Sequence, residues 1–247
     1  MMVETESRDD IRVIALARAE KRNAMLPEML DELLDAINTS VDARAIVLIG
    51  WGKTFCSGFD LKACAQDESG ETLRALLSGL SACISAMRRC TGPVVLGAHG
   101  AAVAGGCALL GGADIVVANR HAKLGYPVVR IGISPAISAP FMLASMRPGV
   151  VRSRLLDSEL IDGDRARTLG LVDELVETPD AVESRAVELA ETLAGKPGIG
   201  CKATKAWLNT VAPVDEDIAK LGLNTSLSLT GSEEEHERLA ALWNSPR

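Results

Sequence analysis

The sequence predicts an α/β fold, with a core of mixed strands and helices followed by a helical C-terminal region. Apolar runs typical of buried strands recur along the first half, at residues 11–18, 45–49, 93–98 and 114–118. Beyond Tyr126 such runs become scarce and helical patterns follow one another. The fragment GKPG at residues 195–198 is the strongest helix breaker in that half. We therefore expect a core over residues 1–195 and a helical region over residues 196–247.

The first elements alternate between strand and helix. Residues 11–18 alternate like a half-buried strand, and residues 27–41 carry apolar side chains at helical spacing. Residues 45–49 form a continuous apolar run, as in a strand that is buried on both faces. The polar residues 65–71 show neither pattern, so we expect a mobile segment there. Residues 72–89 then predict a long helix.

The uncharged stretch over residues 94–113 is long enough to cross a bilayer. It contains six glycines, and its ends match short buried strands. This composition favours a strand, a tight turn and a small-residue helix over residues 105–110, so we predict no membrane span. The helices expected after Tyr126 cover residues 138–146, 150–156, 164–169, 179–194, 201–211, 215–227 and 232–242.

Composition limits the possible ligands and the compartment. The chain has 247 residues, of which 47% are apolar and 24% charged, a balance typical of a globular protein. The net charge of −7 and the lack of a basic run argue against nucleic acid as a partner. The six cysteines and three histidines show no metal-ligand spacing, so we expect reduced thiols and no metal. The first ten residues lack an apolar signal core, and we expect a cytoplasmic protein.

Two glycine-rich turns carry the strongest functional signal, since the chain has no dinucleotide fingerprint and no nucleophile elbow. The segments FCSGFDLK at residues 55–62 and HGAAVAGGCA at residues 99–108 each follow an apolar strand. Small residues let backbone N–H groups face a ligand, and the second segment also opens a helix. Two such donors converging on one oxygen would make an oxyanion hole. The alternative is that the glycines merely allow close packing.

The order of four motifs resembles the crotonase superfamily of enoyl-CoA hydratases and isomerases. The motifs are RxxxRNAM from Arg18, FCSGFDLK, HGAAVAGGCALLGGADIVVA and LGYPVVRIGISP, and the similarity runs over residues 11–205. The resemblance implies a spiral of ββα turns whose helical C-terminal region builds trimers, often paired into hexamers. It also implies an acyl-CoA thioester as ligand and no separate cofactor, because coenzyme A is part of the substrate.

The resemblance further implies roles for individual residues. The backbone N–H groups of Phe59 and Gly105 would bind the thioester oxygen. The adenine and pantetheine path would be lined, partly by backbone atoms, by Arg22, Ser57, Asp60, Leu61 and Lys62.

The sequence departs from the family at its acid–base positions. Hydratases of the family carry two glutamates, and the matching positions here are Ala108 and Val128. Some relatives place an acidic residue after a later I-x-P motif, where this chain has Ala136. Alanine and valine cannot transfer protons, and positioned acid–base groups contribute about 10²–10⁴-fold in rate. Tyr126 is the candidate substitute that we retain, with a structural role as the alternative.

Three functions therefore stay open at this stage. The chain is an enoyl-CoA hydratase/isomerase-like enzyme with a non-standard acid–base set, a non-catalytic acyl-CoA carrier or sensor, or an inactive subunit in a mixed oligomer. The acyl group and the reaction do not follow from the sequence.

Overall fold

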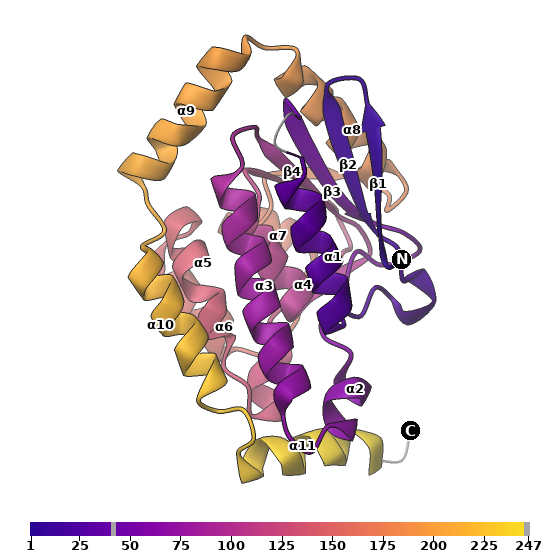
Figure 1. The fold of residues 1–247 in the computed structure, drawn as a ribbon, viewed down its shortest axis with the longest axis vertical. Helices are drawn as coiled ribbons and strands as arrows, with labels where there is room; N and C mark the ends of the chain where they lie inside the picture. The colour runs from indigo at the N-terminus through magenta and orange to yellow at the C-terminus, as the bar shows by residue number, and fades with distance from the viewer. Residues whose placement is uncertain (41–42, 245–247) are drawn as a thin grey trace.

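A six-stranded sheet forms the centre of the computed structural model, which describes residues 1–40 and 43–244 (Figure 1). The strand order is β1-β2-β3-β4-β6-β8, in which β1 pairs antiparallel with β2 and every other pair is parallel. The strands are β1 (Val3–Arg8), β2 (Ile11–Leu16), β3 (Ala45–Gly50), β4 (Val94–Ala98), β6 (Ile115–Asn119) and β8 (Glu174–Val176).

A second, two-stranded sheet pairs β5 (Ala101–Val103) with β7 (Lys123–Gly125) in parallel. The chain passes from β4 to β5 to a short helix, and then from β6 to β7 to a 3₁₀ helix. Each turn thus gives one strand to the large sheet and one to the small sheet before a helical segment. This repeated path is the expected spiral of ββα turns, and the α/β prediction is confirmed.

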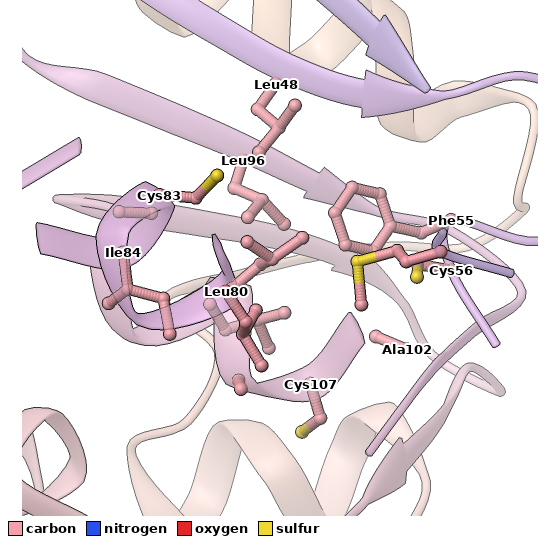
Figure 2. Close-up of a cluster of buried hydrophobic side chains, with 14 of the residues drawn as sticks. Leu48, Phe55, Cys56, Leu80, Cys83, Ile84, Leu96, Ala102 and Cys107 are labelled. Carbon is pink, nitrogen blue, oxygen red and sulfur yellow. The ribbon is translucent and has the colours of Figure 1, made fainter. Parts of the chain in front are cut away.

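Helices cover both faces of the large sheet, which explains its continuous apolar strands. Helices α1 (Pro27–Asn38) and α3 (Glu71–Arg89) lie on one face, and α8 (Ala181–Ala194) lies on the other (Figure 1). Strand residues alternate between the two resulting cores: Val47 faces α8, whereas Leu48 faces α3. Figure 2 shows Leu48 and Leu96 on the strands beside Leu80, Cys83 and Ile84 of α3.

The remaining helical segments surround this core. They are η1 (Ala19–Lys21), α2 (Leu61–Gln66), α4 (Gly105–Ala108), η2 (Leu109–Gly112), η3 (Pro127–Ile131), η4 (Pro135–Ile137), α5 (Ala139–Ser145), α6 (Pro148–Leu156), α7 (Gly163–Leu169), α9 (Gly198–Val211), α10 (Glu216–Leu227) and α11 (Glu233–Asn244). Helices α9 and α10 lie along one side of the molecule and α11 lies across its lower end, coloured orange to yellow in Figure 1.

The C-terminal arm packs against the core through α10 and α11, and specific polar contacts add to this packing. The Lys205 ammonium of α9 lies 2.6 Å from an Asp114 carboxylate oxygen and 2.9 Å from the carbonyl oxygen of Gly92. Ser226 of α10 donates a 2.9 Å hydrogen bond to the Ser134 carbonyl. Helix α9, the first helix of the arm, begins at Gly198, the last residue of the fragment at residues 195–198. Its treatment as a separate region, 196–247, stays a prediction, and residues 245–247 lie outside the described part.

Several local expectations are wrong, each for a physical reason. Residues 65–66 belong to α2 and Glu71 to α3, where only a polar segment was expected, and Asp67 accepts a 2.7 Å hydrogen bond from the Thr72 N–H at the start of α3; the expected mobility of residues 65–71 stays a prediction. Strand β1 was not predicted, since an edge strand with only Val3 buried carries no apolar alternation. Strands β5, β7 and β8 have three residues each, too few for a period to show. The expected helix 27–41 ends at Asn38, and residue 41 lies outside the described part.

Candidate functional site

A buried asparagine shapes the loops in front of the site. Asn23 is fully buried and has a left-handed backbone with φ 52°. Its Nδ2 donates to the carbonyl oxygens of Trp51, Thr54 and Phe55 at 2.9, 2.9 and 3.0 Å. Its Oδ1 accepts from the Arg18 N–H at 2.9 Å. Sequence analysis did not single out Asn23, although asparagine tolerates this conformation better than most residues.

The first turn leaves the N–H of Phe59 without a partner. Gly58 has φ 99°, a conformation that favours glycine. The Met25 N–H donates to the Gly58 carbonyl at 2.8 Å, and the Asp60 N–H donates to the Met25 carbonyl at 2.9 Å. These bonds fix the residues on both sides of Phe59. Within the described residues, nothing accepts a hydrogen bond from the Phe59 N–H itself.

The second turn contacts the first, and it leaves the N–H of Gly105 without a partner. Gly105 is the first residue of α4, so its N–H has no acceptor inside the helix. No acceptor for it exists elsewhere in the described part of the chain. A Cβ atom on Gly105 would lie 2.7 Å from the Met25 methyl carbon and 3.0 Å from the Phe59 ring. A Cβ atom on Gly58 would lie 3.7 Å from the Gly105 nitrogen. The two turns are therefore in contact.

A cavity of about 260 Å³ opens beside these two N–H groups, and its walls are mostly apolar. Phe59 and Gly105 both line it, together with Leu77 and Leu80 from α3. The cavity brings together seven of the residues named from the sequence, namely Ser57, Phe59, Leu61, Gly105, Ala108, Tyr126 and Val128.

Four other residues named from the sequence are not among the described residues that line this cavity. Arg22 and Lys62 are exposed. Ala136 belongs to η4, whose backbone packs against α10: a Cβ atom on Gly222 would lie 2.6 Å from the Ala136 carbonyl oxygen. The fourth residue, Asp60, is paired with Arg18.

The Asp60 carboxylate holds the first turn in place. It lies 2.8 Å from the Arg18 guanidinium and accepts a 3.4 Å hydrogen bond from the Ala63 N–H at the start of α2. Partial burial opposes ionisation of this carboxyl, but the Arg18 hydrogen bond and the backbone donors outweigh it and lower its pKa. Asp60 is thus ionised and already paired.

Tyr126 and Cys107 do not supply a base to the cavity. Tyr126 is 3% exposed, and its hydroxyl donates a 3.1 Å hydrogen bond to the Cys107 carbonyl. Burial raises the pKa of the Tyr126 phenol well above its ordinary value, so the hydroxyl stays protonated. Burial also raises the pKa of the Cys107 thiol to about 12, which excludes a thiolate near neutral pH.

None of the described residues that line the cavity is a carboxylate. Ala108 and Val128 contribute only apolar surface. Among the described residues that line the cavity, Arg130 alone is charged. Arg130 is paired with Glu159 and donates a 2.6 Å hydrogen bond to the Ser158 hydroxyl. Two N–H donors beside an apolar wall can stabilise negative charge on an oxygen, and the described lining offers no carboxylate for proton transfer.

Comparison with known proteins places this geometry in a family. The sequence profile of enoyl-CoA hydratase/isomerase matches residues 6–240. The chain belongs to the enoyl-CoA hydratase/isomerase family. It is 32% identical to a putative enoyl-CoA hydratase of Thermus thermophilus over 213 residues, which cover 84% of this chain and 83% of that protein. It is 29% identical to the peroxisomal Delta(3,5)-Delta(2,4)-dienoyl-CoA isomerase of Arabidopsis thaliana, over 71% of this chain and 67% of that one.

Solved structures confirm the crotonase fold of this family member. The crystal structure of the enoyl-CoA hydratase from Bacillus halodurans superposes with a TM-score of 0.86 at 25% identity, covering 98% of this chain and 100% of that one. No helix in the described part of the chain is both long and apolar enough to span a membrane. The described residues also contain no group of three or more His, Cys, Asp and Glu side chains arranged to hold a metal ion.

Proposed function

We propose that this family member binds an acyl-CoA thioester in the apolar cavity, with the thioester oxygen accepting hydrogen bonds from the N–H groups of Phe59 and Gly105. The observation that carries the proposal is that two residues from turns in contact, both with N–H groups that lack partners among the described residues, line the same cavity. Such fixed donors stabilise an enolate or a tetrahedral oxyanion without reorganising. The apolar wall fits an uncharged acyl group, because burying a charge there would be costly.

The proposed site lacks the acid–base pair of a hydratase. Adding water to an enoyl thioester requires proton transfer, and Ala108, Val128 and Ala136 cannot provide it. The Tyr126 hydroxyl is protonated and donates its hydrogen bond to the Cys107 carbonyl, so a role for Tyr126 as a base is not supported. The alternative function, favoured by the same wall, is a non-catalytic acyl-CoA carrier or sensor, or an inactive subunit of a mixed oligomer.

The coenzyme A portion would run past the first turn. Arg22 and Lys62 are exposed cations near that turn and suit its phosphates, while Ser57 and Leu61 line the cavity beside Phe59. Asp60 would act indirectly, by holding the turn through Arg18. No separate cofactor is proposed.

Hydration of crotonyl-CoA tests this proposal. The loss of enoyl-thioester absorbance should show turnover far below ~10 s⁻¹, the median for enzymes. In the same preparation, calorimetric titration should show that butyryl-CoA binds more tightly than coenzyme A alone. Fast hydration would overturn the claim about the missing acids. Equal affinity for butyryl-CoA and coenzyme A would overturn the claim about the acyl cavity.

We also propose that the protein is a cytoplasmic homotrimer or hexamer. Helix α9 exposes Trp207 by 63%, Leu208 by 56% and Val211 by 53%, and α10 exposes Ile218 and Leu221 by 49% and 59%. Clusters of exposed apolar side chains commonly mark interfaces between subunits. Sedimentation should give three or six copies of the 26.0 kDa chain at micromolar concentration, and a monomer alone would contradict the proposal.

A further inference from the structure

We infer that Tyr126 is a positioning residue that aims the Gly105 N–H at the thioester oxygen, by holding the carbonyl of Cys107 in the same short helix. The inference rests on the proposed function of the cavity. It assigns Tyr126 no contact with the reacting atoms and no proton transfer.

Helix α4 has only four residues. Its Ala108 N–H donates to the Ala104 carbonyl at 2.9 Å, and the Leu109 N–H at its end is shared between the carbonyls of Gly105 and Cys107. Ala104, just before the helix, has φ 53° and ψ −117°, a conformation that an L-residue adopts only under constraint. The direction of the Gly105 N–H depends on the conformation of this strained residue, so contacts that hold Ala104 and the residues after Gly105 also hold the N–H.

Two consecutive residues of another segment supply those contacts. The Gly125 carbonyl, at the end of β7, accepts the Ala104 N–H at 2.8 Å. The next residue, Tyr126, donates its hydroxyl to the Cys107 carbonyl at 3.1 Å. One anchor lies immediately before Gly105 and the other lies two residues after it. The donor is therefore held from both sides by a single stretch of chain.

The phenol is suited to this role. It is buried and protonated, so it remains a neutral hydrogen-bond donor throughout the physiological pH range. Ser138, 4% exposed, is a polar neighbour of the same hydroxyl. A phenylalanine at position 126 would fill the same space but could not donate the hydrogen bond. The Tyr126→Phe variant therefore distinguishes the effect of the hydrogen bond from the effect of packing.

The experiment follows the carbonyl stretch of bound butyryl-CoA by isotope-edited infrared spectroscopy. Hydrogen bonds from Phe59 and Gly105 should lower the stretching frequency in the wild-type protein. In Tyr126→Phe we expect a loss of part of that shift and roughly two- to tenfold weaker binding of butyryl-CoA, the range for one hydrogen bond. Binding of the matching thioether, S-butyl-CoA, should not change, because it has no carbonyl oxygen.

Ser145→Ala is the matched control. The Ser145 hydroxyl also donates to a backbone carbonyl, that of Phe141 at 3.2 Å, but it does not line this cavity. It should leave both the shift and the affinities unchanged. The chain contains a single tyrosine, so labelling with fluorotyrosine alters Tyr126 alone. If Tyr126→Phe fails to fold, this labelled protein replaces it: its stronger donor should keep the carbonyl shift at least as large as in the unlabelled protein.

The possible results distinguish the positioning role of Tyr126 from the proposed binding of the thioester oxygen by Phe59 and Gly105. A wild-type shift that persists in full in Tyr126→Phe, or that shrinks on fluorotyrosine labelling, would overturn the positioning role alone. Equal weakening of thioester and thioether binding would reduce Tyr126 to packing and would also overturn it. Absence of a shift in the wild-type protein would overturn the proposed function, and the inference with it.

Discussion

Replacing Asn23 by alanine should be among the most damaging single changes outside the hydrophobic core. The side chain satisfies three carbonyl oxygens and one N–H that join the loops in front of the cavity. One of the four bonds is fully buried and three are partly buried. The two hydrogens of Nδ2 are shared among three carbonyl oxygens, so the side chain makes about three full bonds. Counting about 1–2 kcal/mol for the buried bond and about 0.5–1 kcal/mol for each of the other two gives roughly 2–4 kcal/mol.

The backbone of Asn23 adds a second contribution. Its φ of 52° lies in the left-handed region, where alanine is disfavoured by about 1 kcal/mol and glycine is not. Asn23→Gly should therefore lose the same hydrogen bonds and yet be about 1 kcal/mol more stable than Asn23→Ala. Comparison of the two variants isolates the backbone effect.

Equilibrium urea denaturation at matched protein concentration measures these differences, because an oligomer makes stability depend on concentration. Asn209→Ala is the control: it loses one exposed hydrogen bond to the Arg88 carbonyl and should change stability by no more than about 0.5 kcal/mol. An Asn23→Ala protein within about 1 kcal/mol of wild type would refute the reasoning, and so would equal stabilities of the alanine and glycine variants.

Three further predictions follow from single contacts. Burial lowers the pKa of His99 despite its hydrogen bond to the Gly52 carbonyl, so the folded state favours the neutral imidazole. The free energy of unfolding, measured by urea denaturation, should therefore fall as the pH drops from about 7 to 5. In His99→Gln this pH dependence should be weaker. Lys205→Met should cost about 1–2 kcal/mol in the same assay, because it removes the hydrogen bonds of the buried ammonium to the Asp114 carboxylate and the Gly92 carbonyl; a loss below about 0.5 kcal/mol would contradict this. Ala108→Glu with Val128→Glu should raise crotonyl-CoA hydration more than either change alone, since both carboxylates would act on one water; a folded double variant that binds butyryl-CoA without any gain would show wider divergence of the pocket.

The sequence predicted those parts of the fold in which a long apolar period meets a clear boundary. Helix α3 was expected over residues 72–89 and spans Glu71–Arg89, and the strand expected at residues 45–49 spans Ala45–Gly50. Helix α3 buries one face and β3 is buried on both faces. The buried positions must be apolar, and this requirement gives each element a recognisable apolar pattern in the sequence. The polar strand β1 buries only Val3 and left no such signal.

In the candidate site, too, only residues that belong to a local sequence pattern could be predicted. The small residues marked the two turns in advance, whereas Phe59 and Gly105 could be named only through the resemblance to the crotonase superfamily. Asn23 could not be named, because its importance lies in carbonyls 28 to 32 residues away. Tyr126 was taken for a proton-transfer candidate from its place beside a missing acid. Its hydroxyl instead bonds the Cys107 carbonyl, a tertiary contact that no local pattern contains.

The most direct test of the account compares the affinities of the wild-type protein for butyryl-CoA and for S-butyl-CoA by calorimetric titration. The two ligands differ only in the carbonyl oxygen that the N–H groups of Phe59 and Gly105 are proposed to bind. Two hydrogen bonds of about 0.5–1.5 kcal/mol each predict that the thioester binds roughly 5- to 150-fold more tightly. Equal affinities would contradict the central claim, because they would mean that neither N–H group binds the thioester oxygen.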